Sequence, residues 1–121
     1  MRVVIAEDEV LLREGLSRIL EGDGVTVLAA VGTAEQLERE VDRHRPDLAI
    51  TDIRMPPTHT DEGLVAALRI RQAHPGVGVV VLSQHVQRRY ATELLGQDRG
   101  FGYLLKQRIA DVRTFTDSLR R

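Results

Sequence analysis

The chain has 121 residues, enough for one domain with a single packed core. Its 42% hydrophobic and 29% charged residues are ordinary for a globular protein. Its net charge of −1 does not provide the positive electrostatic potential that attracts nucleic acid. The absence of cysteine excludes disulfides and cysteine-based zinc sites, and no apolar run approaches the roughly 20 residues of a transmembrane helix. We therefore expect a cytoplasmic domain that is not itself a DNA-binding surface.

Short apolar runs rich in β-branched residues alternate with helix-period segments along the whole chain. Several runs are nearly continuous rather than alternating, which is typical of parallel strands covered on both faces. The first run directly follows Met1 and Arg2 and is too short for the apolar core of a signal peptide, so we expect a strand there. The predicted strands are residues 3–6, 25–30, 48–51, 79–82 and 101–105.

The segments between these strands carry apolar residues at helical spacing. Thr33 and Gln36 form a capping-box pattern before the second helix, and residues 74–76 (His-Pro-Gly) close the third. Five strand–helix pairs imply right-handed crossovers and one α/β domain, with helices on both faces of a parallel sheet. The apolar stripes of the five predicted helices are Leu12, Leu16, Ile19 and Leu20; Leu37 and Val41; Leu64, Leu68 and Ile70; Val86, Tyr90 and Leu94; and Ile109, Val112, Phe115 and Leu119.

Polar residues follow four of the predicted strands. In an open parallel sheet, ligands bind beyond the carboxyl ends of the strands, so these residues are expected to share one rim. Acids so close together repel one another unless a hard divalent cation such as Mg²⁺ lies among them. An ammonium group and a hydroxyl at the same rim would suit an anion such as a phosphoryl group. The strand-end residues are Glu7, Asp8 and Glu9; Asp52; Ser83 and Gln84; and Lys106.

Each of these residues has a simpler explanation when taken singly. An acid after a strand often caps the next helix, and a lysine at a strand end is usually solvated. The convergence of four strand ends on complementary chemistry favours a functional site.

Four motifs together resemble the receiver domain of response regulators over the whole chain, residues 1–121: "VVIAEDE", "LAITDIRMP", "VVVLSQ" and "GYLLK". The stretches "DIRMPPTHTDEGL" and "GFGYLLKQRI" are similar to regulators of the NarL/LuxR type. The resemblance implies a flavodoxin-like (βα)5 three-layer sandwich whose parallel five-stranded sheet has the strand order 2-1-3-4-5.

The resemblance also implies a metal-assisted phosphoacceptor site. By its motif position, Asp52 would accept the phosphoryl group and ligate Mg²⁺ together with Asp8 and the backbone carbonyl of Arg54. Glu7 would act on the ion through water. Such a domain is not an enzyme in the usual sense, because it promotes only its own phosphoryl transfer and dephosphorylation.

Three further residues would receive and transmit the phosphoryl group. Lys106 would pair with the phosphoryl oxygens, Ser83 would donate a hydrogen bond to one of them, and Tyr103 would change rotamer with that movement. The implied partners are a sensor histidine kinase and, on phosphorylation, a second copy of the chain. DNA would be bound only through a C-terminal helix-turn-helix domain that lies outside this chain, a single-domain regulator being the alternative.

The chain departs from the family pattern in two places. Gln107 follows the lysine where many receivers have proline, which leaves the isomer of the Lys106–Gln107 peptide open. The segment "PPTHTDEG" is a few residues longer than the corresponding loop of a typical receiver. The four histidines lack zinc-ligand spacing, so no zinc site is predicted.

Two other functions are alternatives. A haloacid-dehalogenase-like phosphatase also uses a strand-end aspartate and Mg²⁺, but that family needs a second aspartate two residues on, where this chain has Arg54. A receiver-like interaction module that takes no phosphate is the other alternative, and the presence of every charged position argues against it.

Overall fold

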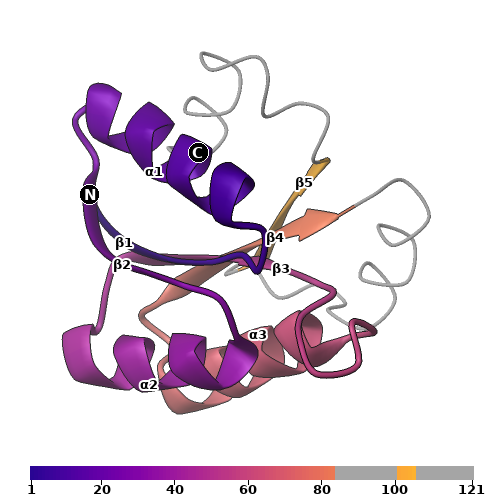
Figure 1. Cartoon of the computed structure of the whole chain (residues 1–121). Coiled ribbons are helices and arrows are strands. Elements are labelled where there is room, and N and C mark those ends of the chain that lie inside the picture. Colours follow the sequence, from indigo (N-terminus) through magenta and orange to yellow (C-terminus); the bar gives the residue numbers. More distant parts are fainter. Residues whose placement is uncertain (84–100, 106–121) are drawn as a thin grey trace.

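The apolar runs of the sequence form one parallel sheet (Figure 1). The computed structural model describes residues 1–83 and 101–105. The predicted strand order is confirmed: the sheet runs β2-β1-β3-β4-β5. The strands are β1 Arg2–Ala6, β2 Thr26–Val31, β3 Leu48–Asp52, β4 Gly78–Ser83 and β5 Phe101–Leu105.

Helices cover both faces of this sheet, as the continuous strands predict (Figure 1). Helix α1 (Val10–Gly22) lies on one face, and α2 (Ala34–His44) and α3 (Glu62–Ala73) lie side by side on the other. The predicted fourth and fifth helices fall outside the described residues. No helix in the described part of the chain is long and apolar enough to span a bilayer.

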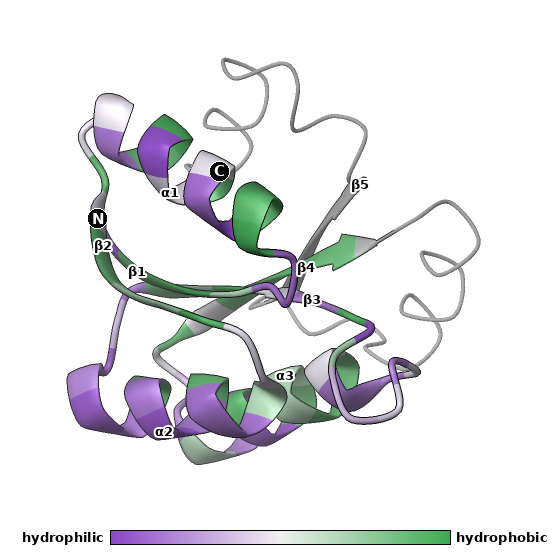
Figure 2. Ribbon diagram, in the orientation of Figure 1, coloured by the Kyte–Doolittle hydropathy of each residue, from purple (hydrophilic) through white to green (hydrophobic). Residues whose placement is uncertain are grey.

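The core divides into two layers because successive side chains of a strand point to opposite faces. In β1, Val4 and Ala6 pack with α2 and α3, whereas Val3 and Ile5 pack with α1. β3 is buried along its whole length, through Asp52. Figure 2 shows the hydrophobic residues on the strands and on the helix faces that meet them. Burial on both faces therefore explains why the runs are continuous in sequence.

The capping pattern before α2 is confirmed, with one change of partner. The Thr33 hydroxyl oxygen accepts a hydrogen bond from the Gln36 backbone N–H at 3.1 Å. The Gln36 side-chain oxygen accepts from the N–H of Gly32 at 3.2 Å, one residue before the predicted donor. Both bonds satisfy backbone groups at the entrance to the helix and fix where α2 begins.

The strand register decides which acids become neighbours. Ala6 of β1 pairs with Thr51 of β3, so Glu7 and Asp52 follow at the same level on adjacent strands. Asp52 in turn pairs with Leu82 of β4. Two carboxylates are thereby placed at the carboxyl edge of the sheet by backbone pairing alone.

Candidate functional site

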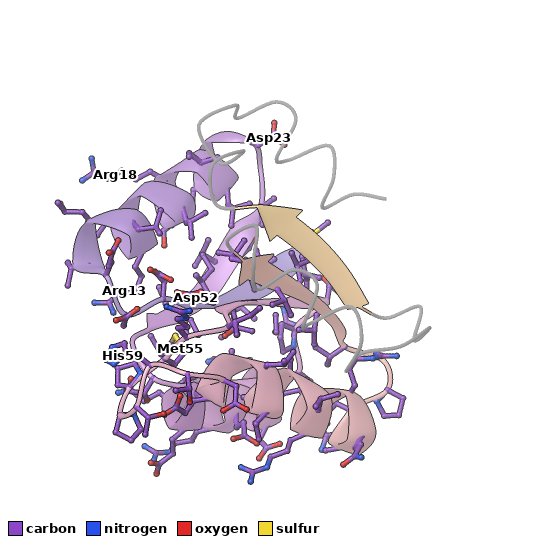
Figure 3. All side chains as sticks on the ribbon, turned by 90° about the vertical axis from the view of Figure 1, so that its right-hand side faces the viewer. Arg13, Arg18, Asp23, Asp52, Met55 and His59 are labelled. Atoms are coloured by element: carbon purple, nitrogen blue, oxygen red, sulfur yellow. The ribbon has the colours of Figure 1, made fainter. Side chains whose placement is uncertain are left out.

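Three carboxylates meet at the carboxyl ends of β1 and β3, as the sequence predicts. Glu7, Asp8 and Asp52 each offer an oxygen, and these oxygens lie within 4.8 Å of one another. Glu7 is 0% exposed and Asp52 is 3% exposed, whereas Asp8 is half-buried. Figure 3 shows Asp52 at this end of the sheet, near Arg13, Met55 and His59.

The donor set fits a hard divalent cation. All three groups are carboxylates, and oxygen ligands are those that Mg²⁺ prefers. Burial weakens the solvent screening between like charges, so an ion among them would remove a large repulsion. These three residues could therefore hold Mg²⁺, the cofactor that the sequence predicts.

The other predicted site residues are described only in part. Arg54 is exposed in the loop that follows β3, where its backbone carbonyl remains a predicted ligand. The backbones of Ser83 and Tyr103 lie in the adjacent strands β4 and β5, and their side chains are outside the described part. Lys106 falls outside the described residues. The predicted roles of these four residues stay predictions.

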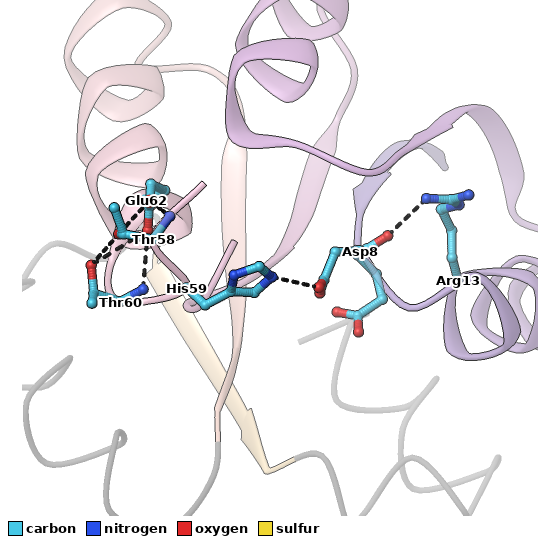
Figure 4. Close-up of polar contacts among 7 residues, drawn as sticks. Asp8, Arg13, Thr58, His59, Thr60 and Glu62 are labelled. Carbon is cyan, nitrogen blue, oxygen red and sulfur yellow. Dashed lines mark hydrogen bonds and ion pairs between the residues drawn. The ribbon is translucent and has the colours of Figure 1, made fainter. Parts of the chain in front are cut away.

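Two side chains whose contacts the sequence did not reveal, His59 and Arg13, lie against the acidic segment (Figure 4). The His59 ring nitrogen Nε2 lies 3.1 Å from Oδ2 of Asp8, and these residues are 51 positions apart in the chain. Arg13 donates from Nη1 to the backbone carbonyl oxygen of Glu7 at 3.0 Å. The length of the segment after β3 was the one sequence signal for the histidine contact.

Glu62 organises the loop that carries His59 (Figure 4). Its carboxylate accepts from the hydroxyl and the N–H of Thr58, the latter at 2.7 Å, and from the N–H of Thr60 at 3.1 Å. The Thr58 hydroxyl is the main cause that lowers the pKa of Glu62 to about 2, and the Thr58 N–H is the next. The carboxylate that ties this loop to the start of α3 therefore stays ionised in acid.

We expect Glu62→Gln to weaken the pH dependence of folding. A carboxyl group with a lowered pKa stabilises the folded chain fully above its unfolded value and loses that contribution as pH falls through its folded value. The contribution of Glu62 should therefore be complete above pH 4.5 and disappear towards pH 2. Urea unfolding of both proteins at pH 6 and at pH 2.5 measures this, and the two curves should converge in acid.

The control for this prediction is Glu35→Gln, which changes an exposed acid in the first turn of α2 whose partner is Arg39. A stability difference between wild type and Glu62→Gln that persists unchanged at pH 2.5 would contradict the assignment.

Gly63 brings the start of α3 against the end of β3. A Cβ atom at this position would lie 1.6 Å from the backbone carbonyl oxygen of Asp52. The Gly63 N–H donates to the carbonyl oxygen of Ile53 at 2.9 Å. Only glycine permits this approach, so the glycine fixes the backbone of Asp52 against the helix.

Comparisons with known proteins match most of the chain to one family. Residues 3–115 match the family model described as the response regulator receiver domain. Over 120 residues the chain is 32% identical to the oxygen regulatory protein NreC of Staphylococcus carnosus (strain TM300), covering 94% of this chain and 54% of NreC. It is 36% identical over 113 residues to the transcriptional regulatory protein DegU of Brevibacillus brevis, covering 93% of this chain and 46% of DegU.

A solved structure gives the same result. The signal receiver domain of the NarL response regulator from Mycobacterium tuberculosis superposes with a TM-score of 0.75 at 29% identity, covering 96% of this chain and 93% of that one. This chain spans about half the length of the curated regulators it matches. Its relatives include the regulators NreC, DegU and NarL, in agreement with the NarL/LuxR-type motifs of the sequence. The chain belongs to the response regulator receiver domain family.

Proposed function

We propose that this chain accepts a phosphoryl group on Asp52 from the phosphohistidine of a sensor kinase and thereby controls a transcription-regulating output. The observation that carries the proposal is the triad formed by the buried Glu7 and Asp52 and the half-buried Asp8 at the strand ends of a receiver fold. This triad combines a nucleophile with ligands for the ion that phosphoryl transfer needs.

The transfer is a substitution at phosphorus. An oxygen of the Asp52 carboxylate attacks, an O–P bond forms, and the P–N bond to the kinase histidine breaks. The departing imidazole nitrogen keeps the electron pair of that bond and takes up a proton. When bound, Mg²⁺ screens the negative charge on the phosphoryl oxygens. Asp8 and Glu7 would hold that ion, directly and through water, and the Lys106 ammonium would pair with a phosphoryl oxygen.

The product differs from the free site by charge and size. A carboxylate of charge −1 becomes a group of about −2 with three new acceptor oxygens. The Ser83 hydroxyl would donate to one of them, and Tyr103 would follow by a change of rotamer. Phosphorylation thus acts like a ligand that binds one of two conformations more tightly. Attack by water on phosphorus later releases phosphate and restores the carboxylate of Asp52.

The output is proposed from the relatives. DegU is named a transcriptional regulatory protein, and this chain corresponds to about half of it. We propose that the chain works with a C-terminal helix-turn-helix domain that binds DNA, in the cytoplasm, and that phosphorylation favours a homodimer.

Acetyl phosphate tests the proposal without a kinase. Incubation with acetyl phosphate and Mg²⁺ should add the mass of one phosphoryl group, about 80 Da, in an intact-mass spectrum. Chelation of the metal should suppress the adduct. No adduct under any condition would favour an interaction module that takes no phosphate, and release of phosphate from small phosphoesters would revive the phosphatase alternative.

Apolar side chains beside the acids suit a kinase contact. Leu11, in the first turn of α1, is 89% exposed, and the neighbouring Val10 is also exposed. Both follow directly after the acidic segment, so a kinase whose phosphohistidine reaches Asp52 would contact these two side chains.

We expect Leu11→Ser to slow phosphoryl transfer from a purified sensor kinase by about tenfold, because an apolar anchor at an interface contributes on the order of 1–2 kcal/mol. Labelling by acetyl phosphate should stay within about twofold of wild type, since the acids are untouched. Val65→Ser, which alters another exposed apolar residue on α3, is the matched control. If Leu11→Ser slowed the transfer from the kinase and the labelling by acetyl phosphate equally, the substitution would have damaged the phosphoacceptor site.

A further inference from the structure

His59 occupies a backbone conformation that its residue type disfavours. Its φ angle is +56°, in the left-handed region, where the Cβ atom of any residue other than glycine meets steric hindrance. The segment that holds it there is well tied. The His59 N–H donates to the carbonyl oxygen of Met55 at 2.9 Å, and Met55 is fully buried. A conformation of this kind persists only where the surroundings fix it.

The neighbours of His59 supply that fixation. Thr58 and Thr60, on either side of it, both donate to the Glu62 carboxylate at the start of α3. The loop is therefore held at both flanks, and its histidine is directed towards Asp8 rather than away from the domain (Figure 4). The side chain is 53% exposed, so burial of apolar surface does not explain its placement.

We infer that His59 is a positioning residue for the metal ligand Asp8. The ring Nε2 lies at hydrogen-bond distance, 3.1 Å, from Oδ2 of Asp8, and a ring N–H donated there leaves the second carboxylate oxygen for the ion. Carboxylates that bind metals are commonly held by such outer hydrogen bonds, which set the carboxylate orientation before the ion arrives. Asp8 then loses its side-chain entropy when the chain folds, and no further entropy is lost there when the ion binds.

This inference rests on the proposed function, because it assigns a role towards the same ion. It goes further because it assigns a function to the longer loop after β3. The loop brings a donor from 51 residues away to a ligand that follows β1. Loss of the donor should therefore weaken ion binding without loosening the fold.

The decisive variant is His59→Gly. Glycine adopts a positive φ angle without steric cost, so this change removes the side chain while leaving the loop conformation intact. The matched variant is His59→Gln, whose side-chain N–H reaches about as far as Nε2 of the histidine. Dissociation constants for Mg²⁺, from isothermal titration calorimetry, and melting temperatures without metal are measured for both and for wild type.

We expect His59→Gly to raise the dissociation constant for Mg²⁺ by about three- to tenfold, which is below the roughly 10- to 100-fold typical of side chains that hold a metal ligand, because the contact is exposed. His59→Gln should recover part of that loss. The melting temperature of His59→Gly without metal should equal or exceed that of wild type, since backbone strain is relieved.

Three results would overturn the inference. Unchanged affinity in His59→Gly would show that the contact plays no part in ion binding. Higher affinity would show that His59 instead competes with the ion for Asp8. A fall in the metal-free melting temperature of His59→Gly that is large enough to explain its weaker Mg²⁺ binding would show that His59 has only a structural role. If wild type itself binds no Mg²⁺, the metal site of the proposed function fails, and this inference fails with it.

Discussion

Asp52→Asn is expected to take up no phosphoryl group from acetyl phosphate, while wild type gains about 80 Da. The asparagine amide has nearly the same shape as the carboxylate, but it lacks the charge that makes the oxygen a nucleophile. The measurement is the intact mass after incubation with Mg²⁺. Because the change also removes one of the three carboxylates proposed to hold the ion, Mg²⁺ should raise the melting temperature of wild type but not of the variant.

The controls separate chemistry from folding. Replacing Asp52 removes one of three mutually repelling charges, so we expect its metal-free melting temperature to be at or above that of wild type. Asp61→Asn changes another aspartate near the site, in the loop before α3, and should keep the adduct. An adduct that persists in Asp52→Asn would mean that another residue accepts the phosphoryl group.

Gly63→Ala is expected to destabilise the domain by about 3 kcal/mol, which corresponds to a fall of roughly 10–15 °C in melting temperature. The added Cβ would lie 1.6 Å from the carbonyl oxygen of Asp52 and 2.8 Å from its carbonyl carbon. Both atoms are backbone, so no rotamer change relieves the collision and α3 must move away from β3. Thermal and urea unfolding, followed by circular dichroism, measure the effect.

Gly15→Ala is the matched control for this change. Gly15 lies within α1, and a Cβ atom there would meet nothing within 4 Å. Alanine has the higher helix propensity, so this substitution should stabilise the domain by about 0.5–1 kcal/mol. A stability loss of similar size for both glycine variants would contradict the argument from close approach.

The fold was largely predictable because its signals are local. Continuous apolar runs separated by helical stripes predict parallel strands and crossovers, and the capping pair Thr33 and Gln36 marks the start of α2. The meeting of the acids was predictable for a different reason. The carboxyl ends of parallel strands share one edge, so residues that directly follow strands are neighbours whatever their separation in sequence.

The remaining contacts depend on loop conformation, which local patterns do not encode. The pairing of His59 with Asp8 requires a positive φ angle at the histidine and the hydrogen bonds that Glu62 accepts from Thr58 and Thr60. The role of Gly63 arises only when α3 packs against β3. Histidine spacing along the chain could not reveal a partner that comes from a different strand end.

The backbone beside Asp52, the proposed phosphoacceptor, is held on two sides. The N–H of Ile53 donates to the carbonyl oxygen of Leu82 on β4, and the carbonyl oxygen of Ile53 accepts from Gly63 on α3. Because these two hydrogen bonds restrain the residue that follows Asp52, a group added to Asp52 could not be accommodated by a shift of the backbone. Under the proposed function, the effect of phosphorylation would then reach the surface through rotation of side chains, and the rigid backbone at this position would favour such transmission.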